Sequence, residues 1–246
     1  MTWSIVAKDP QSGAIGIAVA SRFFAVGARV PFVAPGIGAV ATQALINPLY
    51  GPKGLALLRG GTSAQDTLAA LIEEDTGRDH RQAQVMDAQG RVAAHTGAAC
   101  VDWCGAISDD LCGVAGNMLV GPQVLEETAR AYREHADLPF PRRLIAAMRA
   151  GEDAGGDKRG KQSAGLVIHT SEDWPDLDLR VDDHPEPIAE LARIERVSRE
   201  RWAHFKRFLA TRADPVGIVD RARIDSEIAA ALAAQAAEEA ERAVGA

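Results

Sequence analysis

The sequence predicts an α+β fold in which two antiparallel sheets face each other and are covered by helices. This is a four-layer αββα sandwich, with further helices at the C-terminal end. Strand-like segments come in groups separated by helix pairs, whereas a parallel α/β fold alternates single strands with single helices. The segments 14–20 and 38–44 are also apolar on both faces, which is typical of strands enclosed between two layers.

The strands are expected where short apolar runs are bounded by turn residues. The segment Asp9-Pro10-Gln11-Ser12-Gly13 is such a turn and joins the first two strands into a hairpin. A second hairpin turns at Asp87-Ala88-Gln89-Gly90. The predicted strands are 2–8, 14–20, 28–34, 38–44, the two arms of the hairpin over 82–97, 112–119, 163–169 and 177–182.

Helices are expected where apolar residues recur every three or four positions. The predicted helices are 51–60, 63–74, 121–135, 139–150, 185–212 and an alanine-rich helix after Pro215. We therefore expect a main domain over 1–183 and a helical extension over 184–246. Trp202, Phe205 and Phe208 form an apolar stripe on the extension, and we expect it to pack on the core or across a homodimer interface.

Charge and composition exclude several classes of protein. The formal net charge of −7 argues against general nucleic-acid binding, which uses a basic surface. Arg22 and Arg29 interrupt the longest apolar stretch near the N-terminus, so it predicts no membrane span. That stretch also lacks the pattern of a secretory signal. We expect a cytoplasmic protein that binds a small molecule.

No cofactor is predicted. Gly36-Ile37-Gly38-Ala39-Val40-Ala41 matches a permissive dinucleotide-binding pattern, but the apolar run continues as a strand instead of opening a helix. Cys100, Cys104 and Cys112 lie near His95, yet their spacing differs from the paired cysteines of zinc sites. An odd number of cysteines fits a reducing compartment, so we expect free or buried thiols.

Thr2 follows the initiator Met1 and is the candidate nucleophile. If Met1 is removed, the hydroxyl and a free α-amine lie on one residue. That amine titrates near pH 7.7–8.0, so it can act as a general base for the hydroxyl. Many chains begin with Met-Thr for no catalytic reason, so the hypothesis needs support from the rest of the chain.

The first strands resemble those of N-terminal-nucleophile (Ntn) hydrolases such as proteasome β-subunits. The similarity lies in TWSIVAKDPQSGAIGIAVASR, with Thr2, Lys8-Asp9 and Ser21-Arg22 at the matching positions. Five segments are more similar still to a bacterial family of unknown function, number 1028, regarded as Ntn-hydrolase-like. They are SIVAKDPQSGAIGIAVASRFFAVG, GIGAVATQALINPLYGPKGLALL, AAHTGAACVDWCG, AGNMLVGPQV and AGGDKRGKQSAGLVI. The resemblance implies an Ntn-like fold over about residues 2–170.

Two departures from the proteolytic pattern limit the chemistry that the resemblance implies. Arg29 occupies the position of the catalytic lysine, and a guanidinium does not give up its proton near neutral pH. Ala20 occupies the position of a supporting aspartate. Thr2 would therefore depend on its own amine, with Arg29 binding or polarising a carboxylate.

Other polar residues of the similar segments are candidates for the site. Asn117 or Gln43 would donate to an oxyanion, or would only satisfy main-chain groups. Asp157 and Arg159, in a glycine-rich loop, would bind substrate at the mouth of a cleft, and His95 is either a substrate-binding residue or a half-buried structural histidine. The predicted catalytic residues are Thr2, Arg29 and Asn117, and the predicted substrate-binding residues are Gln43, His95, Asp157 and Arg159.

These observations support three hypotheses. The first is an Ntn-type hydrolase that acts on a small carboxylate-bearing amide. The second is a non-catalytic binding protein that keeps the scaffold, which the missing lysine and aspartate favour. The third is a hydrolase that uses Ser21 or Cys104 as its nucleophile.

Overall fold

The computed structural model describes residues 2–244, so Met1, on whose removal the Thr2 hypothesis depends, lies outside the described residues. The chain divides into two compact units, Met1–Ala192 and Arg193–Ala246. Both sheets belong to the first unit. No helix in the described part of the chain is long and apolar enough to span a bilayer.

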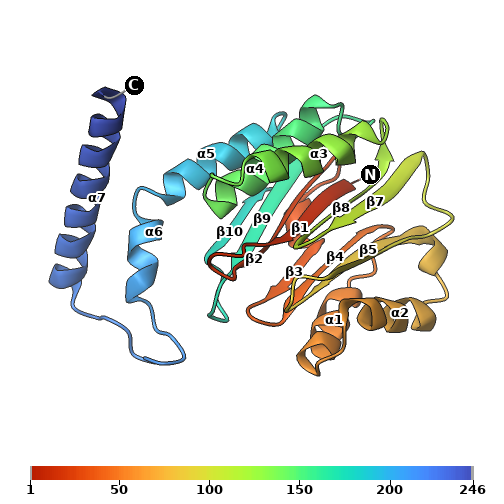
Figure 1. Cartoon of the computed structure of the whole chain (residues 1–246), viewed down its shortest axis with the longest axis horizontal. Helices are drawn as coiled ribbons and strands as arrows, with labels where there is room; N and C mark the ends of the chain where they lie inside the picture. Colours follow the sequence, from red (N-terminus) through yellow and green to blue (C-terminus); the bar gives the residue numbers. More distant parts are fainter. Residues whose placement is uncertain (1, 245–246) are drawn as a thin grey trace. The chain divides into compact units, whose positions relative to one another are not determined.

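The first unit contains a six-stranded and a four-stranded antiparallel sheet (Figure 1). The larger sheet has the order β10-β9-β2-β1-β8-β7 and the smaller one β3-β4-β5-β6. Their strands are β1 Thr2–Lys8, β2 Ile15–Ser21, β3 Pro31–Ala34, β4 Gly38–Ala44, β5 Arg81–Asp87, β6 Val92–Thr96, β7 Trp103–Asp109, β8 Cys112–Leu119, β9 Ser163–His169 and β10 Leu177–Val181. The predicted α+β fold with antiparallel sheets is confirmed.

The core between the sheets is made mostly of small and β-branched side chains, together with Met86. Ile17 and Val19 of the larger sheet lie in one buried cluster with Ala39, Ala41 and Met86 of the smaller sheet. All five are fully buried. Ala39 and Ala41 contribute short side chains to this core from the smaller sheet.

Helices pack on both sheets. Helices α1 (Tyr50–Arg59) and α2 (Ala64–Glu74) cover the smaller sheet through a buried cluster that includes Leu58, Leu68 and Val85. Helices α3 (Gln123–Glu134) and α4 (Phe140–Asp153) pack against each other and contact the larger sheet. There, Gly16 leaves room for α4, because a Cβ would lie only 3.0 Å from Leu144 Cδ1.

Two of the strand predictions need correction. The strand expected over 28–34 begins only at Pro31, because a short 3₁₀ turn, Val26–Ala28, comes first. Strand β7, Trp103–Asp109, was not predicted at all. It lies at the edge of the larger sheet, where most of its side chains are partly or fully exposed. An edge strand therefore lacks the apolar pattern that identified the others.

The single helix expected over 185–212 is wrong. Helix α5 (Pro187–Ser198) ends where Ser198 Oγ donates to the Glu195 carbonyl at 2.6 Å, a bond that competes with the helical pattern. The short helix α6 (Trp202–Phe205) and a 3₁₀ turn, Lys206–Phe208, follow. In the second unit Phe205 and Phe208 pack with Ile224 and Ile228 of α7 (Arg221–Val244). The homodimer stays a prediction.

Asp75, at the end of α2, joins several elements of the first unit. Its carboxylate accepts hydrogen bonds from Asn47 Nδ2 and the Tyr50 hydroxyl, both at 2.9 Å. It also accepts from Gly77 N at 2.7 Å and Arg81 Nε at 3.1 Å. These bonds, led by that from Asn47, hold the pKa of Asp75 well below its usual range despite burial. Asp75 therefore connects the loop that follows β4 with the start of β5.

We expect Asp75→Asn to lower the free energy of unfolding by roughly 2–3 kcal/mol at pH 7, because bonds to a charged acceptor are lost. The carboxyl pKa is depressed in the folded state. Its contribution is therefore fully present above the unfolded pKa, about 3.9, and is lost as pH falls below that value. Urea unfolding should show that the difference in free energy of unfolding between wild type and Asp75→Asn is smaller at pH 3 than at pH 7. Glu73→Gln, an exposed change on the same helix, is the control. A difference that does not change with pH would contradict the stabilising role of the charged Asp75 carboxylate.

Candidate functional site

Thr2 is the first residue of a central strand of the larger sheet. Strand β1 pairs with β2 on one side and β8 on the other, and Thr2 lies opposite Asn117. Thr2 is only 6% exposed. Its Oγ1 donates to the Oγ of Ser21, the last residue of β2, at 3.1 Å. Two hydroxyl groups thus meet where β1 begins and β2 ends.

Buried amides from both sheets surround the Thr2 main chain. Gln43 Nε2 and Asn117 Nδ2 each donate to the Thr2 carbonyl at 3.4 Å. Both also donate to Gln82 Oε1, at 2.8 and 3.0 Å. Gln82 Nε2 in turn donates to the Gly116 carbonyl at 2.8 Å. The structure therefore brings two of the predicted site residues, Gln43 and Asn117, directly to Thr2.

Asp157 lies in the loop before β9 and holds the loop that follows Ser21. Its side chain is almost fully buried. Oδ2 accepts from Arg22 N at 2.7 Å, and Oδ1 accepts from Arg159 N at 2.8 Å. Arg159 Nη2 also pairs with Oδ2 at 3.3 Å. Asp157 is thus engaged by protein donors and supports the end of β2, while Arg159 extends beyond it.

Two adjoining cavities share Phe23, Ala44 and Leu45, and Thr2 lines one of them. We call the larger one, of about 460 Å³, the Arg29 compartment. It is lined by Thr2, Phe23, Val26, Ala28, Arg29, Phe32, Ala44, Leu45, Ile46 and Pro48. The second, of about 340 Å³, is the Arg159 compartment. It is lined by Phe23, Ala44, Leu45, His80, Ala99, Cys100, Val101, Asn117, Met118 and Arg159.

The loop that carries Phe23 and Arg29 is held against β9. Buried Ser163 donates from its Oγ to the Phe23 carbonyl and accepts from Val26 N, the latter at 3.1 Å. Gly27 lies so close to Gly165 that a Cβ on Gly165 would be 2.6 Å from the Gly27 Cα. Arg29 therefore projects from a fixed main chain, although it follows a 3₁₀ turn and not the start of a strand.

The opposite wall comes from the loop after β4. Ala44 adopts a left-handed conformation with φ of 67°, which turns the chain out of the strand. Arg81 Nη1 donates to the Leu45 carbonyl at 2.6 Å, and Arg81 is itself paired with Asp75. The Asp75 cluster thus sets the position of Leu45 at the junction of the two compartments.

The structure does not bring His95 to Thr2. Its Nε2 lies 3.0 Å from the Arg78 carbonyl. The next residue, Thr96, accepts from Gln82 Nε2 at 2.9 Å and so faces the larger sheet. Because neighbouring side chains of a strand point to opposite faces, His95 points away from the larger sheet.

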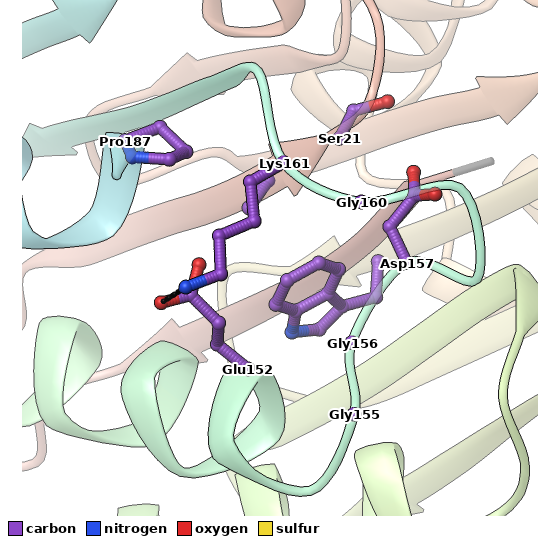
Figure 2. A pocket seen from close by; sticks show the side chains of 10 residues that line it. Ser21, Glu152, Gly155, Gly156, Asp157, Gly160, Lys161 and Pro187 are labelled. Atoms are coloured by element: carbon purple, nitrogen blue, oxygen red, sulfur yellow. Dashed lines mark ion pairs between the residues drawn. The ribbon is translucent and has the colours of Figure 1, made fainter. Parts of the chain in front are cut away.

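A smaller cavity of about 80 Å³ lies next to the Asp157 loop. Figure 2 shows Glu152 and Lys161 paired in it, at 3.2 Å, while the Ser21 and Asp157 side chains point away from that pair. Burial raises the pKa of Glu152. Trp3, which also lines the cavity, alternates with Thr2 along β1 and so points to the other face of the sheet. This cavity is separate from the Thr2 side chain.

The thiols differ in exposure. Cys112 is buried, and burial raises its pKa to about 12, while Cys100 and Cys104 are partly buried. Burial also raises the pKa of Cys100, which disfavours the reactive thiolate. Among the side chains that the structure describes, those of residues 2–237, no group of three from His, Cys, Asp or Glu could hold a metal ion.

Sequence reasoning missed Gln82, Ser163 and Asp75. A signal exists for the first: Gln82 and Gln84 alternate with apolar residues in the strand QAQVMD, which places both amides on one face. Ser163 and Asp75 lie at the ends of elements, where polar residues are common. Their roles depend on contacts with residues far away in the sequence.

Comparisons with known proteins show the family to which the chain belongs. The chain resembles the crystal structure of protein SPO2555 from Silicibacter pomeroyi, with 33% identity, a TM-score of 0.81, and 89% of this chain and 99% of that chain covered. Anbu (ancestral beta-subunit) from Yersinia bercovieri matches with 12% identity and a TM-score of 0.38, covering 80% and 94%. No curated protein matches. Residues 2–191 match the family described as "Family of unknown function (DUF1028)", and the chain belongs to that family.

Proposed function

We propose that the protein is an Ntn-type amide hydrolase, with an αββα scaffold, that acts on a small carboxylate-bearing amide. The observation that carries the proposal is the position of Thr2. It begins a central strand, contacts the Ser21 hydroxyl, and lines a cavity of about 460 Å³ together with Arg29. An N-terminal hydroxyl nucleophile needs such a combination of a fixed main chain and an open substrate space.

In this mechanism the α-amine of Thr2, freed by removal of Met1, takes the proton from Oγ1. The oxygen forms a bond to the substrate carbonyl carbon. The proton then passes to the leaving nitrogen as the C–N bond breaks, which leaves an ester on Thr2 and releases the amine. Water attacks the ester, releases the carboxylic acid and restores the hydroxyl. Arg29 stays charged throughout and attracts the substrate.

Asn117 suits the role of oxyanion donor better than Gln43 does. An amide NH₂ group has two protons to donate. Gln43 Nε2 already has close acceptors in Gln82 Oε1 at 2.8 Å and the Ala115 carbonyl at 3.1 Å. Asn117 Nδ2 has one close acceptor, Gln82, and its bond to the Thr2 carbonyl is long at 3.4 Å. Asn117 can exchange that long bond for a bond to the oxyanion.

The alternative is a non-catalytic protein that binds a ligand in the same cleft. Arg29 and Ala20 in place of a lysine and an aspartate favour it, as does the burial of Thr2. The two proposals differ in what they require of the N-terminus. Only the hydrolase needs a free Thr2 amine.

We expect the intact mass of the purified protein to correspond to a chain without Met1, because the Thr2 amine must be free to act as the base. The rate constant kcat/KM on a panel of N-acyl and N-carbamoyl amino acids should then rise with pH through the amine pKa, about 7.7–8.0. A retained Met1 in an active enzyme would rule out this base.

We expect Thr2→Ala to abolish turnover, by a factor of at least about 10³, and Thr2→Ser to keep measurable activity because the hydroxyl remains. Ser21→Ala should lower kcat only about fivefold, since it removes one hydrogen bond worth about 1 kcal/mol. Full loss in Ser21→Ala with activity kept in Thr2→Ala would instead identify Ser21 as the nucleophile. If neither the wild type nor any variant turns over substrate, and the variants bind the ligand as tightly as the wild type does, the result supports the non-catalytic binding protein.

A further inference from the structure

The two arginines of the cleft differ in whether the protein already neutralises them. Arg159 pairs with the buried Asp157 at 3.3 Å. Arg29 lines the larger compartment, and no acidic side chain among those that the structure describes, residues 2–237, pairs with it. A guanidinium presents forked donors that match a carboxylate. Arg29 is therefore the cation that is available to a ligand.

The rest of the Arg29 compartment is apolar. Apart from Thr2 and Arg29, its lining consists of alanine, valine, isoleucine, leucine, proline and phenylalanine. Two of these residues, Phe23 and Leu45, are 51% and 61% exposed. Mostly apolar walls with a few polar groups are typical of sites for small molecules. The ligand must therefore bring an apolar group as well as a negative charge.

The nucleophile, the cation and the apolar wall all belong to one compartment. In an N-acyl α-amino acid, the amide nitrogen, the carboxylate and the side chain are attached to one carbon. A unit of this kind places its amide at Thr2, its carboxylate at Arg29 and its side chain on the apolar wall. The Arg159 compartment, of about 340 Å³, then receives the acyl half on the other side of the amide.

We infer that the Arg29 compartment binds a hydrophobic α-amino acid as the amine half of the substrate, its carboxylate paired with Arg29. The inference rests on the proposed function for the identity of the scissile amide. Binding itself requires no catalysis. The inference also assigns different roles to the two arginines, because only Arg29 binds the carboxylate.

The test uses the full chain with Thr2→Ala, so that no turnover occurs, and isothermal titration calorimetry with three probes. N-acetylphenylalanine carries both the charge and the apolar group. N-acetylphenylalaninamide lacks the charge, and N-acetylglycine lacks the apolar group. We expect the first probe to bind at least tenfold more tightly than either of the others.

Variants in the same background assign the contacts. Arg29→Gln should weaken binding of N-acetylphenylalanine about tenfold or more and remove its advantage over the amide probe, whereas Arg59→Gln, an exposed arginine on α1, should leave both unchanged. Phe23→Ser should weaken binding of this probe but not of N-acetylglycine. Phe24→Ser is the matched control, because Phe24 is 54% exposed and is not among the residues that line either compartment. Thermal melts confirm that each variant is folded.

Equal affinity for the charged and neutral probes, or for the phenylalanine and glycine probes, would overturn the inference. The inference would also fail if Arg159→Gln removed the preference for the charged probe over the neutral one while Arg29→Gln kept it. That result would place the carboxylate in the Arg159 compartment. The failure of the proposed function looks different. A wild-type protein that binds N-acetylphenylalanine through Arg29 without hydrolysing any amide keeps the inference and removes the hydrolase.

Discussion

The site depends on a cluster of buried amides that joins the two sheets behind Thr2. Gln82 of the smaller sheet accepts hydrogen bonds from Gln43 and Asn117, and it donates to the main chain of β8. A buried amide that loses its partner costs about 1–3 kcal/mol. The sheets therefore cannot slide past each other without breaking several such bonds. This constraint holds the main chain of Thr2, because Gln43 and Asn117 also donate to its carbonyl.

The loops around Thr2 are held by the same means, each through one buried polar side chain. Asp157 accepts from the main chain of Arg22, just after Ser21. Ser163 holds the loop that carries Phe23 and Arg29. Asp75, through Arg81, holds Leu45. The walls of the cleft are thus preorganised although they are loops, and little ordering is required when a ligand binds.

Local patterns in the sequence predicted most strands and helices of the first unit, because burial between layers leaves a clear apolar signature. They failed for β7, whose exposed edge position removes that signature, and for the 185–212 segment, where Ser198 ends a helix that the apolar spacing would continue. In the site, Thr2, Gln43, Asn117 and Asp157 could be selected from short motifs. Their contacts could not, because partners such as Gln82 and Ser163 are distant in the sequence and meet only through sheet pairing.

The substitution that weakens the case for proteolysis also defines the cleft. A lysine at position 29 could exchange a proton, but Arg29 keeps its charge at any physiological pH. In the proposed mechanism the proton therefore travels through the Thr2 amine alone, and Arg29 is left to hold a ligand carboxylate in an apolar compartment. Arg29 is exposed, so its guanidinium is open to a ligand that enters the compartment. In the proposed mechanism the same residue thus restricts the chemistry to the N-terminus and supplies the charge that selects the substrate.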